Sequence, residues 1–289
     1  MRPDMTTRRA FTAGLLAAPF PALAGEAVDA RLAALEKRTG GRLGVFARDT
    51  LSGRVLLSHR AVERFPMCST FKASLAGFVL SRIDDGKERL ERQVRYGESD
   101  ILDYAPTTKA NLGRGAMTIG ELCEAAVELS DNSAANLLLR ESGGPAALTA
   151  WLRRSGDTAT RLDRNEPTLN EALPGDPRDT TTPASMANTL HRMLFGPSLG
   201  AASRQQLTIW MQHSTTGAAR VRAGLPPGWI AGDKTGTGGR GSVNDIGFAQ
   251  PPKGGPIVFA VYATGTAAKQ AEVEAVHVEV GRLLAGARP

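Results

Sequence analysis

The chain has 289 residues, of which 42% are hydrophobic and 22% are charged, as in an average globular protein. This composition excludes collagen-like, coiled-coil and wholly disordered proteins. The formal net charge of +6 is spread thinly along the sequence, so we expect no binding to nucleic acid or to membrane surfaces. The two cysteines cannot form a disulfide scaffold, and no histidine or cysteine spacing typical of zinc ligands occurs. We therefore expect neither a metal nor another cofactor.

The N-terminus has the features of an export signal. Arg8 and Arg9 precede an apolar stretch at residues 11–20, which is followed by an Ala-Leu-Ala sequence. This order is typical of a cleavable signal over residues 1–24. The arginine pair resembles a twin-arginine signal, and an ordinary Sec signal is the alternative. No other apolar run is long enough to span a bilayer, so we expect an exported, periplasmic or secreted protein without stable membrane association.

The elements predicted along the mature chain fall into three stretches. Apolar residues at helical spacing predict a helix from Val28 to about Gly40, and two strands follow at 42–48 and 54–58. The middle of the chain has the pattern of helices, expected at 69–84, 118–129, 132–141, 145–154, 183–195 and 201–212. The last stretch predicts strands and then a helix, at 229–235, 243–249, 256–263 and 267–284.

This order of elements predicts an α/β fold of the α+β type. Two strands alone are marginally stable, so the N-terminal hairpin must join the C-terminal strands in one antiparallel sheet flanked by the terminal helices. We expect residues 25–65 and 213–289 to form this α/β subdomain, and residues 66–212 to form an inserted all-helical subdomain. Within the insertion, residues 155–181 lack convincing periodicity and contain prolines, and we expect a loop at 160–180. A loop of that length in a compact domain is usually functional.

Three short motifs carry candidate chemistry. Ser69 and Lys72 lie one helical turn apart at a predicted helix start, where free N–H groups favour a developing oxyanion. The Ser-Asp-Asn sequence at Ser130–Asn132 lies between two predicted helices, and the Lys-Thr-Gly sequence at Lys234–Gly236 lies on a predicted strand. Together they supply a nucleophile, two amines, further hydroxyls and an amide. This set suits acyl transfer on an amide whose substrate carries a carboxylate.

A fourth candidate pair lies in the long loop. Glu166 and Asn170 are four residues apart, so a carboxylate and an amide could hold one water between them. That arrangement would supply a general base together with its water.

These four motifs make the sequence resemble the class A serine β-lactamases over nearly all of the mature chain. The resemblance implies the serine β-lactamase and penicillin-binding-protein-like fold. It implies a monomer that hydrolyses the β-lactam ring of penicillins and cephalosporins, and so confers antibiotic resistance. By resemblance, Ser69 forms the acyl-enzyme, Lys72 and Glu166 share the base machinery, and Ser130 passes a proton to the leaving nitrogen. Glu166 and Asn170 would position the deacylating water.

The same resemblance assigns substrate-binding roles to further residues. Asn132 would hold the acylamido side chain, and Lys234 and Thr235 would hold the substrate carboxylate. The backbone N–H groups of Ser69 and Thr237 would form the oxyanion hole. Tyr104 would line the mouth of the site. In the loop, Arg164 would pair with Asp179.

The sequence departs from the family pattern at two places. Many relatives have an arginine where Val243 stands, and Arg220 is the expected substitute; a surface arginine is the alternative. Some relatives link the cysteine before the nucleophile to a second cysteine, but Gly238 occupies that second position. Others pair the cysteine that matches Cys123 with one at the position of Ala76. We therefore predict that Cys68 and Cys123 are free thiols.

Four other functions match parts of the sequence. The glycines at 236–241 match a dinucleotide-binding motif, but a strand rather than the required helix is predicted to follow them. Residues 232–235 nearly match a phosphate-binding loop, but Asp233 interrupts the motif and would repel phosphate. A penicillin-binding peptidase shares the first three motifs and would stay acylated. A non-catalytic cell-wall-binding or drug-sensing domain would need no deacylating water.

Overall fold

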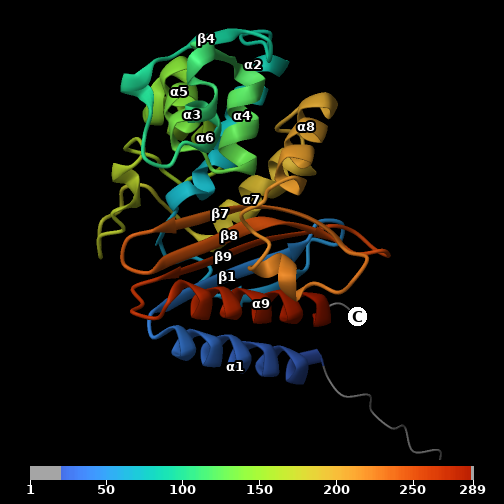
Figure 1. Ribbon diagram of the computed structural model, residues 1–289. Helices are drawn as coiled ribbons and strands as arrows, with labels where there is room; N and C mark the ends of the chain where they lie inside the picture. The colour runs from blue at the N-terminus through green and yellow to red at the C-terminus, as the bar shows by residue number, and fades with distance from the viewer. Residues whose placement is uncertain (1–20, 288–289) are drawn as a thin grey trace, which may run out of the picture.

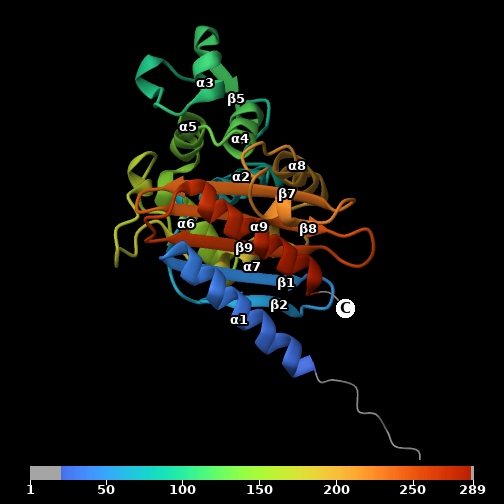
Figure 2. The ribbon, with the colours of Figure 1, turned by 60° about the horizontal axis from the view of Figure 1, so that its bottom comes forward.

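The computed structural model describes residues 21–287, and the signal predicted over residues 1–24 lies mainly outside them. Within the described chain, a five-stranded antiparallel sheet has the order β2-β1-β9-β8-β7. The predicted fold class is confirmed, since helices from both chain ends cover one face of the sheet and a helical region covers the other (Figures 1 and 2). The bounds of the strands are Arg42–Asp49 (β1), Val55–His59 (β2), Ile230–Gly238 (β7), Ser242–Gln250 (β8) and Ile257–Thr264 (β9).

Two hydrophobic clusters hold the sheet between its covering layers. On one face, α1 (Pro21–Thr39) and α9 (Gln270–Gly286) bury Leu32 and Val276 against sheet residues such as Val261. On the other face, α7 (Pro183–Leu194) packs on β1 and β9. Because both faces are covered, almost every residue of β8 and β9 is buried. β9 is a nearly continuous apolar run, whereas β8 also buries the polar residues Asn244 and Asp245.

The helical region is built around α2 (Phe71–Asp84), whose first ten residues are all buried. Helices α4, α5, α6 and α8 pack around it. Their starts match the signals in the sequence: Thr118 caps α4 in a capping box with Glu121, and Thr182 caps α7. The bounds are Pro106–Ala110 (α3), Ile119–Glu128 (α4), Asn132–Ser142 (α5), Gly144–Arg154 (α6) and Ala201–Gln212 (α8).

The region expected to be all-helical also contains short strands. β4 (Gln93–Arg95) pairs with β5 (Ala116–Thr118), and β3 (Phe65–Pro66) pairs with β6 (Thr180–Thr181). Strands of two or three residues are too short to show a period of two, which is why the sequence pattern gave no sign of them. The remaining short elements are 3₁₀ turns at Cys68–Thr70, Glu98–Asp100, Leu112–Arg114, Thr168–Asn170 and Val221–Gly224.

The β3–β6 ladder has a consequence for the long loop. It ties Thr180 and Thr181, at the end of the loop, to the residues just before the nucleophile motif. Met67 N–H donates to Asp179 C=O at 2.9 Å and extends the same connection. The loop is thereby attached to the segment that carries Ser69. Within residues 21–287, no helix combines the length and the apolar character that crossing a membrane requires.

Candidate active site

A cleft of about 420 Å³ lies between β7 and the helical region. Eight of the eleven site residues predicted from the sequence line it, and the other three, Lys72, Glu166 and Lys234, are buried. Tyr104 is 52% exposed, as expected for a residue at the mouth. The lining residues are Ser69, Tyr104, Ser130, Asn132, Asn170, Thr216, Arg220, Thr235, Gly236, Thr237, Gln270 and Glu274.

The nucleophile candidate lies at the start of the central helix. Ser69 is in the 3₁₀ turn that leads into α2, and Lys72 follows one turn later with a fully buried side chain. Both reach the same oxygen of Glu166: Ser69 Oγ donates to Oε1 at 3.2 Å, and Lys72 Nζ lies 3.0 Å from it. Burial lowers the pKa of the Lys72 amine, and the Glu166 carboxylate only partly offsets this effect. The hydroxyl, the amine and the carboxylate therefore form one proton-sharing group.

A second buried lysine approaches from the strand side. Lys72 Nζ donates to the Ser130 carbonyl oxygen at 2.8 Å and to Asn132 Oδ1 at 2.6 Å. Lys234 Nζ donates to Ser130 Oγ at 2.9 Å. Burial, reinforced by the charge of Lys72, lowers the pKa of Lys234 well below its usual range. Ser130 has a φ of 61°, a left-handed conformation that non-glycine residues seldom adopt outside functional sites. It connects the two amines.

Asp131, the middle residue of this motif, holds the backbone rather than facing the cleft. Its buried carboxylate caps α5 by accepting from Ala134 N–H at 2.8 Å. The carboxylate also accepts from the backbone N–H groups of Thr107 and Thr108, at 2.9 Å each. Asp131 thus joins α3 to α5 and fixes the position from which Ser130 and Asn132 extend.

The carboxylate of Glu166 is positioned by two asparagines. Asn170 Nδ2 donates to Glu166 Oε2, as the spacing in the loop predicted. The Asn136 side chain bonds the Glu166 backbone on both sides, accepting from its N–H and donating to its C=O, each at 2.9 Å. Asn136 is not among the residues predicted from the sequence. The available signal was its spacing of four residues from Asn132, which puts both side chains on one face of α5.

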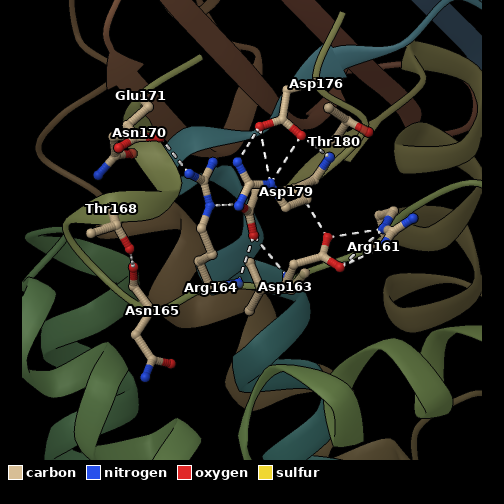
Figure 3. A network of polar contacts seen from close by, with 12 residues as sticks. Arg161, Asp163, Arg164, Asn165, Thr168, Asn170, Glu171, Asp176, Asp179 and Thr180 are labelled. Atoms are coloured by element: carbon tan, nitrogen blue, oxygen red, sulfur yellow. Dashed lines mark hydrogen bonds and ion pairs between the residues drawn. The ribbon is translucent and has the colours of Figure 1, made fainter. Parts of the chain in front are cut away.

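Ion pairs of Arg164 stabilise the long loop (Figure 3). Arg164 Nε lies 2.6 Å from Asp179 Oδ2, which confirms the predicted pair, and a second nitrogen lies 2.6 Å from Glu171. Asp179 Oδ1 accepts from the backbone N–H groups of Asp163 and Arg164, at 2.7 and 2.9 Å. One buried carboxylate therefore joins the two ends of the loop.

Arg220 enters the cleft from the segment before β7. It is only 3% exposed, and Nη2 donates to Thr237 Oγ1 at 2.8 Å, so the alternative of a surface arginine is wrong. Nη1 donates to the backbone carbonyls of Asn244, at 2.6 Å, and Gly236, at 3.2 Å. Glu274 on α9 pairs with Nε at 3.2 Å. The guanidinium therefore sits where a second cation was expected.

Three other residues of the cleft were not anticipated. Gln270 and Glu274 come from α9, and Thr216 accepts a hydrogen bond from Thr235 Oγ1 at 2.7 Å. None of them lies in a motif or at a spacing that relates it to the other site residues. Only the packing of α9 beside the 3₁₀ turn at Val221–Gly224 brings its start to the site.

Both cysteines are free and buried, as predicted. Burial, with the nearby Glu166 carboxylate, raises the pKa of Cys68 to about 12, so its thiol does not compete with Ser69. A Cβ atom placed on Gly238 would lie 2.5 Å from Cys68 Sγ. The glycine therefore occupies the position where a cysteine could face Cys68.

The glycine-rich segment does not have the local structure that a nucleotide-binding site requires. Residues 236–241 form the end of β7 and the tight connection to β8, so a strand follows them and the dinucleotide-binding alternative is wrong. In residues 21–287, no group of three or more histidine, cysteine or acidic side chains is arranged to hold a metal ion.

Comparison with known proteins agrees with the geometry. Residues 27–287 match the model of the β-lactamase enzyme family. The chain is 58% identical to an ancestral class A β-lactamase, GNCA, with a TM-score of 0.88 over 90% of this chain and 100% of that one. It is 52% identical to PenP from Rhodopseudomonas palustris, a candidate class A β-lactamase. That match has a TM-score of 0.88 and covers 91% of this chain and 100% of that one.

Proposed function

The chain belongs to the class A β-lactamase family of serine hydrolases, and on that premise we propose that it opens penicillins and cephalosporins through an acyl-enzyme on Ser69. The observation that carries this proposal is the contact of Glu166 with Ser69, Lys72 and Asn170 at once. Family membership decides against the peptidase and the non-catalytic alternatives, because class A β-lactamases hydrolyse β-lactams.

Acylation begins with loss of the Ser69 proton. The hydroxyl already donates to Glu166 Oε1, and Lys72, with its lowered pKa, shares that oxygen. Ser69 Oγ attacks the β-lactam carbonyl while its proton passes into the Glu166–Lys72 pair, Glu166 being the acceptor in direct hydrogen-bond contact. The backbone N–H groups of Ser69 and Thr237, both in the lining of the cleft, stabilise the oxyanion.

Ring opening requires a proton for the leaving nitrogen. Ser130 Oγ donates that proton and is resupplied by the lysines on either side of it, Lys234 at 2.9 Å and Lys72 at 3.5 Å. Burial lowers the pKa of each amine, which makes each of them a better proton donor than an exposed lysine.

Deacylation uses Glu166 a second time. Once the Ser69 oxygen is acylated, the Glu166 carboxylate and Asn170 hold a water against the ester carbonyl. Glu166 removes one proton from this water, the water oxygen bonds to the carbonyl carbon, and the Ser69 oxygen leaves with a proton returned from the base. A neutral carboxyl or amide at 166 cannot do this, so deacylation would fail first.

Substrate binding uses the remaining residues of the cleft. Asn132 holds the acylamido group, and Lys234, Thr235 and Arg220 hold the carboxylate. Support comes from the position of the Arg220 guanidinium at Thr237 Oγ1 on the edge of the cleft. Turnover of these substrates in a growing cell would confer β-lactam resistance.

A chromogenic cephalosporin in excess over the protein tests the proposal. We expect steady hydrolysis, many equivalents per protein molecule. A single stoichiometric burst would mean that water does not reach the acyl-enzyme, and no colour change would mean that Ser69 is not a nucleophile. Ser69→Ala is the matched control, because it removes the nucleophile from a site that is otherwise intact.

Export and organisation complete the proposal. Class A β-lactamases are typically exported, and Arg8 and Arg9 before an apolar stretch support the twin-arginine route. Replacing both with lysine should abolish export by that route and leave Sec export unchanged. We further propose a monomer without stable membrane association, divided as residues 25–65 with 213–289 and residues 66–212.

A further inference from the structure

A second cavity, of about 500 Å³, lies behind the long loop and away from the catalytic cleft. One wall is the loop itself, from Leu169 to Arg178, and the other is the end of the sheet with Arg42, Arg64 and Arg240. In Figure 1 this loop lies beside the ends of β7, β8 and β9. The volume is that of an ordinary small-molecule site.

The charge of this cavity is strongly unbalanced. Five arginines line it, and only two acidic residues do, Glu63 and Asp176. Both acids are already paired: Glu63 lies 2.8 Å from Arg42 and 2.9 Å from Arg60, and Asp176 lies 2.7 Å from Arg178. The third arginine of the lining, Arg164, is paired with Asp179 and Glu171.

Two cations remain without a carboxylate. Arg64 donates only to neutral groups, the Ala159 carbonyl and Thr180 Oγ1, and Arg240 makes no ion pair with any of residues 21–287. Both side chains are exposed and line the same cavity. An anion placed between them would meet two unneutralised guanidinium groups, which suit a carboxylate by charge and by shape.

Apart from Thr180, Thr264 and glycine backbone, the rest of the lining is apolar. Pro66, Leu169, Ala172, Leu173 and Pro174 face the cavity, and Leu173 is 42% exposed although it is a large hydrophobic residue. A ligand that removed this surface from water would gain hydrophobic stabilisation in addition to the charge contacts. The site therefore combines a cationic end with an apolar body.

We propose that this cavity binds a small amphipathic carboxylate, with the carboxylate at Arg64 and Arg240 and an alkyl or aryl chain along Leu173. The site is separate from the cleft of Ser69, but the two share one piece of backbone. Leu169 lines the cavity, and the next residue, Asn170, holds Glu166. Ligand bound behind the loop consequently restrains the segment that carries the deacylating groups.

Isothermal titration of the mature protein with octanoate, and with the neutral octanamide, tests the proposal at fixed ionic strength. We expect saturable binding of octanoate at one site and binding of octanamide that is at least fivefold weaker. Leu173→Glu, which adds a negative charge at an exposed position, should abolish octanoate binding. Arg64→Gln and Arg240→Gln should each weaken it about three- to fivefold, the loss expected for an exposed ion pair.

Arg89→Gln is the control, because Arg89 is exposed and does not line the cavity. Its octanoate affinity should equal that of the unmodified protein. Octanoate should also slow amide exchange at residues 172–178, a readout that does not depend on catalysis. The proposal is overturned if octanoate does not bind, if octanamide binds equally well, or if Arg89→Gln weakens binding as much as Arg240→Gln.

Discussion

The long loop carries two buried carboxylates, Glu166 and Asp179, whose surroundings differ in one decisive respect. Asp179 faces the Arg164 guanidinium and two backbone N–H groups, so its partners cannot give up a proton. Glu166 faces Lys72, an amine whose pKa is lowered by burial, and the Ser69 hydroxyl. The two side chains are similarly buried, 4% and 1% exposed. Burial therefore does not distinguish a catalytic carboxylate from a structural one; the acidity of its partner does.

The pKa shifts of the partners point the same way. Against the effect of burial, hydrogen bonds to Asp179 and Glu171 raise the pKa of Arg164, whereas burial dominates at Lys72. A guanidinium in an ion pair stays charged at every accessible pH and fixes geometry. An amine whose pKa has been lowered can exchange its proton with a neighbour. The two carboxylates of the loop therefore differ in their counter-ion: Asp179 has an arginine that stays charged, and Glu166 has a lysine that can exchange a proton.

The largest effect is expected from Glu166→Ala. Removing the general base should slow deacylation by roughly 10²–10⁴-fold and acylation much less. Penicillin should then leave a stable adduct on Ser69, measured as added mass on the intact protein. Glu171→Gln, at an exposed carboxylate of the same loop, is the control and should turn over normally. Wild-type turnover by Glu166→Ala without an adduct would remove Glu166 from the mechanism.

Asp179→Asn tests the structural half of the comparison. It leaves the Arg164 guanidinium without its buried partner, and we expect a loss of about 3 kcal/mol in the free energy of unfolding. Urea denaturation measures this, and turnover should fall because the loop that positions Glu166 loosens. Asp176→Asn, in an exposed pair with Arg178, should change stability very little. Equal losses in the two variants would show that burial of the Arg164–Asp179 pair carries no special stability.

Arg220→Ala tests whether one buried arginine contributes both to substrate binding and to the stability of the fold. We expect kcat/KM to fall about ten- to hundredfold, the range for a charged hydrogen bond. Arg220 also donates to two buried backbone carbonyls. A loss of about 1–3 kcal/mol in unfolding free energy should therefore accompany the kinetic loss. Arg220→Lys should restore part of kcat/KM, and unchanged kinetics in Arg220→Ala would assign the carboxylate to Lys234 and the hydroxyls.

His277 is a buried ionisable group that has no counter-ion among residues 21–287. It is fully buried on α9, neither ring nitrogen makes a hydrogen bond of normal geometry, and burial with the nearby Arg220 lowers its pKa to about 3. Between pH 3 and 6.5 the unfolded chain binds a proton here that the folded chain does not, so stability rises with pH in that window. Lowering the pH from 7 to 5 should cost about 2 kcal/mol.

Urea denaturation of the wild type and of His277→Gln at pH 7 and pH 5 isolates this contribution from the other titrating groups. The variant should lose about 2 kcal/mol less than the wild type over that interval. Identical pH dependence in the two proteins would mean that His277 is as easily protonated in the folded state as in the unfolded one.

Most of the fold and of the candidate site could be predicted from the sequence because the signals are local. The capping box at Thr118 and Glu121 and the apolar run of β9 depend on neighbouring residues only. The same holds for Ser69 and Lys72, whose spacing sets them on one helical face. Local signals of this kind survive in a single sequence, and the structure confirms the elements that they predicted.

Tertiary structure decided the contacts between distant segments. The sequence determined that Glu166 and Asn170 lie close together, but only the packing of α5 against the loop brings Asn136 to the Glu166 backbone. Likewise, Glu274 lies 54 residues after Arg220 in the chain. It reaches Arg220 because α9 packs beside the 3₁₀ turn at Val221–Gly224, which directly follows Arg220. The cavity behind the loop arises in the same way, from arginines of four separate segments. Hydrophobic burial, which is non-directional and acts across the whole chain, brings these distant segments together, and no local sequence pattern predicts the resulting contacts.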